Sequence, residues 1–136
     1  MELLDQYLKV KPSTLPGTGK GLFTTIDIPK GSLITEYKGI ITTWKHVDHD
    51  EGRNLYIYYV SRNHVINAKG YKNAVAHFAN DANGPIKVKG IKNNSDYIIK
   101  NKRVFIKALK DIPAKSEVLV SYGKEYWDTL KENGVI

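Results

Sequence analysis

The segment that decides the fold is Val118-Leu119-Val120-Ser121-Tyr122-Gly123-Lys124-Glu125-Tyr126-Trp127, near the carboxyl end of the chain. An apolar strand ends at Tyr122 and Gly123 follows at once, so the phenol is placed where the backbone turns. A phenol held at a strand end can orient an amine or hold its proton. Because Ser-Tyr-Gly after a strand is also a common turn, the interpretation depends on two further segments, residues 17–23 and 77–81.

The length and composition are those of an ordinary globular domain. The chain has 136 residues, of which 41% are apolar and 26% charged. We expect a single domain over residues 1–136, with a core at about 8–127 and a short helical tail at 124–136. The chain contains no Cys, which excludes disulfides, thiolate zinc sites and a Cys nucleophile.

The distribution of apolar residues predicts no transmembrane helix, because the longest apolar run is only a few residues. The short acidic segment at residues 1–5 predicts no secretory signal. We therefore expect an intracellular, cytoplasmic protein (nuclear if the source is eukaryotic) that has no membrane partner.

The net charge of +7 leaves two interpretations open. One is an acidic or nucleic-acid-bound partner. The other is compositional, because 18 of the 21 basic residues are Lys, and a phosphate-binding face usually recruits the bidentate fork of Arg. A basic β domain that binds nucleic acid is therefore an alternative, and its affinity would fall steeply with salt. Its binding face would comprise Lys87, Lys89, Lys92, Lys100, Lys102 and Arg103.

Short runs rich in aromatic and β-branched residues dominate the chain and are typical of strands. They lie at residues 7–10, 32–37, 56–60, 64–66, 97–99, 103–106 and 118–120. Gly, Pro, Asn and Asp separate them as turns. A short helix is expected at 124–133, a helical turn or a flexible loop at 44–52, and a long loop at 80–96. This pattern predicts a mostly β domain.

One sequence unit occurs twice. Asp27-Ile28-Pro29-Lys30-Gly31-Ser32 recurs as Asp111-Ile112-Pro113-Ala114-Lys115-Ser116. Each unit is a Pro turn that leads into an apolar strand ending in Tyr, at Tyr37 and at Tyr122. Two similar β-units folded against each other would explain the repeat, and chance similarity of two Pro turns remains the alternative.

Three features indicate a ligand pocket. The alternating glycines of residues 17–21 let a ligand approach the main chain closely, but they lack the ending and the long following helix of a phosphate loop. Asn80 can donate and accept at once, which suits a zwitterionic ligand. Tyr56 and Tyr58 face the same side of a strand, where rings can surround an alkyl chain that ends in an amine. Each feature also has an ordinary explanation, as a hairpin, a turn cap or half-buried tyrosines.

In this order the segments resemble the SET domain, the knotted fold of most lysine methyltransferases. The resemblance extends from about Leu8 to Trp127 and matches the family's Arg-Phe-Ile-Asn-His-Ser signature loosely. The stretches that carry it are Gly19-Lys20-Gly21-Leu22-Phe23, Asp27-Ile28-Pro29-Lys30-Gly31, Glu36-Tyr37-Lys38-Gly39, Tyr56-Ile57-Tyr58, His77-Phe78-Ala79-Asn80-Asp81-Ala82 and Ser121-Tyr122-Gly123. It implies a mostly β, β-clip-like fold of several small sheets with few short helices and a C-terminal pseudoknot. The style is that of compact viral and bacterial SET proteins without post-SET cysteines.

The resemblance implies a protein-lysine N-methyltransferase that transfers a methyl group from S-adenosylmethionine to a lysine ε-amine, without a metal. The implied catalytic residues are Tyr122 and Tyr56, and the implied lysine channel is lined by Tyr56, Tyr58 and Tyr37. The implied cofactor-binding residues are Gly19, Lys20, Gly21, Asn80, Asp81 and Trp127. The implied partner is a protein with an exposed lysine, such as a histone-like or another DNA-associated protein.

The chain departs from the family pattern at three places. Asp81 stands where the family usually has His, and His77 stands where it usually has Arg. If Asp81 acts through its main chain the change is mild, whereas cofactor affinity falls if its side chain braces the knot. Residues 84–92 interrupt the family's Cys-x-Pro-Asn ending, and we interpret them as an excursion rather than as a loop near the cofactor. These departures keep open a catalytically degenerate SET module that acts as a protein-binding domain.

Overall fold

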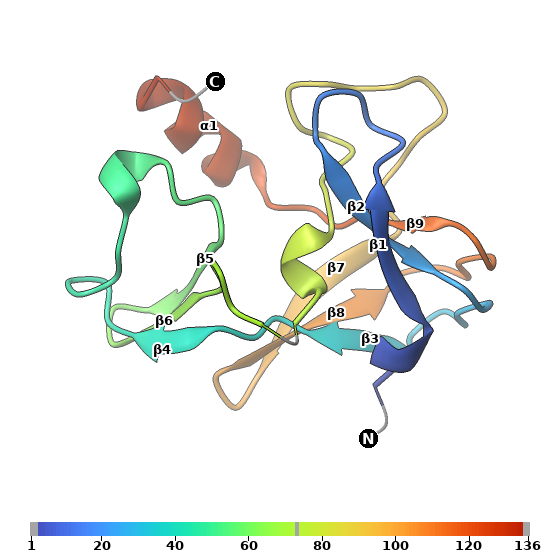
Figure 1. Ribbon diagram of the computed structural model, residues 1–136, viewed down its shortest axis with the longest axis horizontal. Helices are drawn as coiled ribbons and strands as arrows, with labels where there is room; N and C mark the ends of the chain where they lie inside the picture. Colours follow the sequence, from blue (N-terminus) through green and yellow to red (C-terminus); the bar gives the residue numbers. More distant parts are fainter. Residues whose placement is uncertain (1–2, 73, 135–136) are drawn as a thin grey trace.

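Small antiparallel sheets make up most of the protein, as the computed structural model shows for residues 3–72 and 74–134 (Figure 1). The strands are β1 (Leu8–Pro12), β2 (Lys20–Thr24), β3 (Leu33–Glu36), β4 (Ile40–Thr42), β5 (Ile57–Ser61), β6 (His64–Asn67), β7 (Ser95–Lys100), β8 (Arg103–Ala108) and β9 (Glu117–Val118). The sheet orders are β1-β2-β9, β3-β8-β7 and β4-β6-β5. The predicted mostly β fold of several small sheets is confirmed.

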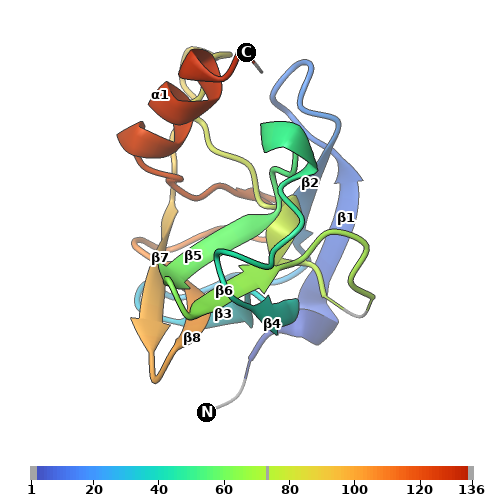
Figure 2. The same ribbon diagram turned by 90° about the vertical axis from the view of Figure 1, so that its left-hand side faces the viewer.

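Helical structure is sparse in the described residues. It comprises the 3₁₀ turns η1 (Asp5–Tyr7), η2 (Asp50–Gly52) and η3 (Ala76–Phe78) and the helix α1 (Lys124–Glu132). The predicted helix at 124–133 is confirmed, and the segment 44–52 is a loop that ends in η2. In both views α1 stands at one end of the molecule and η1 at the other (Figures 1 and 2). None of the described helices is long and apolar enough to span a lipid bilayer.

All three sheets contribute to one hydrophobic core. On strand β8, Val104, Ile106 and Ala108 are buried on the inner face, and Phe105 on the opposite face is buried as well. Leu22 of β2 and Val118 of β9 are also fully buried. The loops that leave these strands therefore start from a rigid base, and they converge on the site described below.

The repeated sequence unit forms a reciprocal pair. The amides and carbonyls of Ile28 and Ile112 exchange two hydrogen bonds of 2.8 Å each. Asp111 accepts from the backbone N–H of Lys30 at 2.8 Å, and Asp27 accepts from that of Ala114 at 2.8 Å. The two copies are therefore folded against each other, as the paired interpretation predicted.

The segment after β9 passes between two distant parts of the chain. On one side the N–H of Val120 donates to the carbonyl of Asn80 at 2.9 Å. On the other side the N–H groups of Asn94 and Ser95 both donate to the carbonyl of Leu119 at 3.0 Å. Both contacts are parallel bridges, so residues 119–120 run between the two ends of the loop that joins Asn80 to β7. This is the threading that a C-terminal pseudoknot requires.

The side chain of Asn94 locks the threaded segment in place. It is buried, donates to the carbonyl of Glu117 at 2.9 Å, and accepts from the N–H of Leu119 at 3.0 Å.

Two strands, β2 and β4, lie where the sequence analysis predicted none. Strand β2 overlaps the glycine segment, where Gly21 weakens the strand pattern, and β4 has only three residues.

Candidate active site

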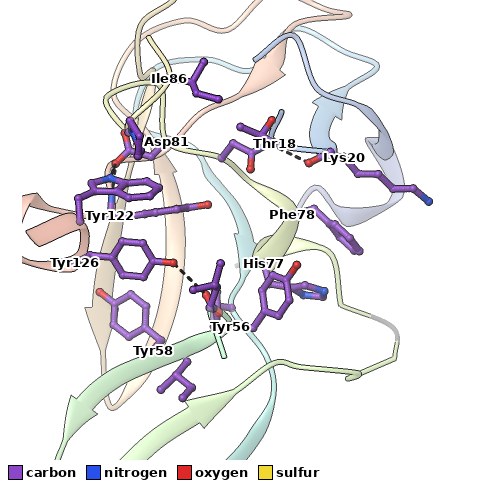
Figure 3. Close-up of a pocket in the computed structure, with 18 of the residues that line it drawn as sticks. Thr18, Lys20, Tyr56, Tyr58, His77, Phe78, Asp81, Ile86, Tyr122 and Tyr126 are labelled. Carbon is purple, nitrogen blue, oxygen red and sulfur yellow. Dashed lines mark hydrogen bonds between the residues drawn. The ribbon is translucent and has the colours of Figure 1, made fainter. Parts of the chain in front are cut away.

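A cavity of about 580 Å³ lies where segments far apart in the sequence meet (Figure 3). Several segments of the chain form the walls of this cavity. Two single tyrosines also line it, Tyr37 after β3 and Tyr97 on β7. Those segments are residues 17–20, 55–58, 77–81, 84–86 and 122–127. Tyr58, Tyr122 and Tyr126 gather on one side, with Thr18 and Lys20 across from them (Figure 3). The glycine segment and the phenol of Tyr122 therefore share one cavity.

Nearly all residues predicted for the site line this cavity. They are Gly19, Lys20, Tyr37, Tyr56, Tyr58, Asn80, Asp81, Tyr122 and Trp127. Gly21 is not among the lining residues, because it lies within β2 opposite Lys11. A Cβ at Gly21 would approach Oε2 of Glu117 to 2.2 Å, so packing of that carboxylate explains the glycine.

Glu117 anchors residues 13–14, which precede the glycine segment. Its buried carboxylate accepts from the hydroxyls of Ser13 and Thr14, at 2.6 Å each, and from the N–H of Thr14 at 2.9 Å. Gly19 has a positive φ of 75°, a conformation that favours glycine and turns the chain into β2. Glu117 of β9 thus fixes the main chain just before it enters the cavity.

Asn80 connects the glycine segment to the threaded segment. Its side-chain amide donates to the carbonyl of Lys20 at 2.9 Å, and its own carbonyl accepts from Val120. The preceding turn η3 presents its residues to the cavity, because Ala76 is buried in the core beneath it. Asn80 therefore fixes the relative positions of both sides of the cavity.

Tyr122 is the residue at which the two sides meet. Its hydroxyl donates a hydrogen bond to the carbonyl oxygen of Ala79. Its ring stacks on Trp127 with centroids 5.6 Å apart and lies edge-on to Tyr126 at 5.0 Å. Burial raises the pKa of the Tyr122 phenol well above its ordinary value. The phenol is therefore protonated at neutral pH.

A cluster of tyrosines lines the cavity wall beside Tyr122. The rings of Tyr37 and Tyr58 lie 5.7 Å apart, and Tyr97 lies 5.0 Å from Tyr58 at an edge-on angle of 70°. Tyr97 and Tyr122 stack at 6.4 Å. The sequence analysis did not select Tyr97, because it lies on a strand remote from the recognised motifs. Burial raises the pKa of Tyr37 and of Tyr97, so these phenols are uncharged at neutral pH.

Tyr126 and Ile86 are among the other lining residues that were not predicted for the site. The hydroxyl of Tyr126 on α1 approaches the carbonyl of Leu55 at 3.5 Å and bridges the two sides of the opening (Figure 3). Ile86 comes from the segment that interrupts the family pattern. The motif Tyr126-Trp127 could have indicated Tyr126, whereas nothing in the sequence indicated that Ile86 lines the cavity.

Residues 84–92 are more than an excursion, so that interpretation was wrong. Gly84, Pro85 and Ile86 line the cavity. Farther along, Val88 and Ile91 pack against a buried cluster of Leu15, Ala82 and Leu119. These apolar contacts fix the insertion beside the glycine segment, which is the alternative that the sequence analysis ranked second.

Asp81 braces the threaded segment through its side chain. Oδ1 accepts from the N–H of Asn83 and the amide of Asn93, both at 2.8 Å. Oδ2 accepts from the N–H of Tyr122 at 3.0 Å and the indole N–H of Trp127 at 2.8 Å. Of the two roles considered for this residue, the structure therefore shows the bracing one.

His77 also lines the cavity, beside Tyr56, whose ring lies 5.3 Å away. Its Nδ1 is buried and has no hydrogen-bond partner among the described residues. Burial lowers the pKa of His77, so the ring is neutral at pH 7. The position that carries Arg in the family pattern is thus uncharged in this chain.

The buried tyrosines predict how the protein responds to alkaline pH. The chain has nine Tyr, and burial raises the pKa of a subset, to about 12 for Tyr126. That subset is Tyr37, Tyr58, Tyr97, Tyr122 and Tyr126. The native state retains protons that the unfolded chain releases near pH 10, so stability falls as pH rises above about 10.

A spectroscopic titration measures this effect. We expect tyrosinate absorbance to develop in two stages, the second coinciding with loss of the circular dichroism of the folded protein. A free Tyr model compound gives the reference curve at about pH 10. Ionisation of all nine tyrosines in one transition near pH 10, with the fold intact, would contradict the burial described here.

Comparisons with known proteins agree with this architecture. The family model described as SET domain matches residues 19–123, which include Asn80 and Tyr122. Among solved structures, the methyltransferase domain of human PR domain-containing protein 2 is similar, with a TM-score of 0.61 and 24% identity. The match covers 86% of this chain and 77% of that one, and at this identity it shows the fold. A search of curated proteins found no significant match.

Proposed function

The chain belongs to the SET domain family, and from this premise we propose that it is a protein-lysine N-methyltransferase that uses S-adenosylmethionine. Members of this family are usually methyltransferases, and the expected SET fold is confirmed. The observation that carries the finer proposal is the shared cavity, in which the main chain of residues 17–20 faces the Tyr122 phenol. The polar main chain suits the methyl donor, and the aromatic side suits the amine that accepts the methyl group.

The cavity fits the chemistry of the cofactor. Its volume of about 580 Å³ lies within the range of sites for small molecules. Lys20 and Asn80 would hold the zwitterionic amino acid end, while Asp81 and Trp127 lie on the wall proposed for the adenine end. The cofactor, when bound, would supply a sulfonium methyl group that an amine can attack, with the neutral thioether as the leaving group. Gly17 and Gly19, both with positive φ near 75°, keep the main chain here free of side chains.

The aromatic wall prepares the amine. A lysine ammonium has an ordinary pKa of about 10.4 and must lose its proton to attack. Desolvation among Tyr37, Tyr58 and Tyr97 lowers the pKa of an amine that enters. The Tyr122 hydroxyl, held by the carbonyl of Ala79, then orients the lone pair. Alignment of this kind supplies up to about 7–11 kcal/mol of the barrier reduction.

One contact weighs against each of the two alternatives. Asp81 completes the site rather than disrupting it, because its carboxylate is satisfied by four N–H groups. For nucleic acid, the fork of Arg103 is already paired with the carboxylate of Glu36, at 2.7 and 3.0 Å. We therefore also propose an intracellular protein substrate with an exposed lysine, of the histone-like or DNA-associated class, rather than nucleic acid itself.

Calorimetry with S-adenosylmethionine tests cofactor binding. We expect the wild-type chain to bind and the Asn80→Ala variant to bind about tenfold or more weakly, because it loses the amide that holds the carbonyl of Lys20. Asn63→Ala, in the exposed turn between β5 and β6, is the matched control and should bind like the wild type. Absence of heat with the folded wild-type protein would refute the proposal.

A further inference from the structure

The indole of Trp127 is held on three sides by groups from separate segments. Its N–H donates to Asp81 at 2.8 Å, and its face stacks on the ring of Tyr122 at 24° between planes. Its benzo edge lies against Gly84, where a Cβ would approach Cζ2 of the indole to 2.7 Å. This ring is too close to Gly84 for any side chain at that position, so its place is narrowly defined.

The Asp81 carboxylate is the polar part of this arrangement. The residue is 5% exposed, and every lone-pair direction of the carboxylate meets an N–H group. Among the described residues no Lys, Arg or His lies within ion-pair distance of it. The carboxylate is therefore stabilised by charge-assisted hydrogen bonds from neutral donors, in place of an ion pair.

The same carboxylate oxygen serves both Trp127 and the main chain of Tyr122. Because Oδ2 accepts from both, a shift of the indole is transmitted to the residue that carries the phenol. Asn80, the preceding residue, is bonded to Lys20 on the other side of the cavity. Residues 80–81 thus connect the glycine segment with the aromatic end.

We propose that the Asp81 carboxylate is a positioning residue that sets the Trp127 indole as a wall of the cofactor-binding end of the cavity. The role rests on the proposed function. Asp81 acts through Trp127 and Tyr122 rather than on the reacting atoms, and Gly84 provides the clearance that the indole needs. A residue that merely stabilised the fold would not control the environment of this one ring.

The first arm of the test needs no ligand. The chain has two Trp, and a Trp44→Phe background leaves Trp127 as the only one. In that background Asp81→Asn, which directs an amide N–H₂ at existing donors, should shift the emission of Trp127 to the red and increase its quenching by acrylamide. Gly84→Ala should do the same from the side of the insertion. Unchanged emission and quenching in both folded variants would overturn the proposal.

The second arm measures S-adenosylmethionine binding. Asp81→Asn should raise the dissociation constant about tenfold, and Trp127→Phe, which keeps a ring but removes the N–H, should raise it similarly. The double variant should be little weaker than either single one, since both remove one interaction. Additive losses would show that Asp81 does not act through Trp127.

A matched control variant and the possible negative results distinguish the role of Asp81 from the proposed methyltransferase function. Asp128→Asn removes an exposed carboxylate from the same helix, where it pairs with Lys124 at 2.8 Å, and should change neither readout. If the parent chain binds no S-adenosylmethionine, the proposed function fails, while the fluorescence arm still decides whether Asp81 positions the ring. If Asp81→Asn does not fold, Trp127→Phe removes the same hydrogen bond from the other side, and an unchanged dissociation constant would overturn the proposal.

Discussion

Replacing Tyr122 by Phe is expected to lower the rate of methyl transfer about 100-fold or more, with little change in S-adenosylmethionine affinity. The substitution keeps the ring that stacks on Trp127 and Tyr97 but removes the hydroxyl that donates to Ala79. The amine then loses its orienting oxygen, while the walls of the cavity remain. The effect should therefore fall on turnover rather than on cofactor binding.

The measurement is transfer of a labelled methyl group to a lysine-rich protein, with cofactor binding followed by calorimetry. Tyr59→Phe is a matched control, because Tyr59 lies on β5 with its ring against Trp44, outside the cavity lining. It should transfer at the wild-type rate. A Tyr122→Phe variant as fast as the wild type would exclude the catalytic role, and a wild type that binds cofactor but transfers nothing would favour the degenerate module.

Replacing Asn94 by Ala is expected to lower the free energy of unfolding by about 3 kcal/mol. The buried side chain donates to the carbonyl of Glu117 and accepts from the N–H of Leu119. Two buried backbone groups lose their partners, and each costs about 1–3 kcal/mol. For a chain of 136 residues the midpoint of thermal unfolding should drop by about 10 °C.

Thermal and denaturant unfolding of both proteins check this expectation. Asn83→Ala makes the same chemical change in the same loop at an exposed side chain, and should alter stability by less than about 0.5 kcal/mol. Equal stabilities of the Asn94 and Asn83 variants would show that the threaded segment is not locked by Asn94. The comparison thus isolates the contribution of the buried amide.

The local parts of the fold were readable from the sequence. Runs of aromatic and β-branched residues predicted the strands at 64–66 and 103–106, which the structure shows as β6 and β8. The repeat at residues 27–32 and 111–116 predicted a pair, because identical Pro turns present the same backbone groups to each other. Gly17, Gly19 and Tyr122 were recognisable because glycines and a strand-end phenol are rare in that combination.

The remaining parts depend on contacts that sequence patterns do not encode. Tyr97 is an ordinary strand residue until the sheet β3-β8-β7 turns its ring toward Tyr58. The insertion at 84–92 has no periodicity, and only the packing of Val88 against Leu15 and its neighbours brings it to the cavity. The four bonds of Asp81 join residues up to 46 positions apart, so no local rule predicts them.

The passage of residues 119–120 between Asn80 and Ser95 also sets an order of events during synthesis. A ribosome delivers both flanks of that opening before Tyr122 leaves the exit tunnel. The threaded segment can therefore form only after the late residues arrive. The cavity, whose walls include Tyr122, Tyr126 and Trp127, is complete only after that step.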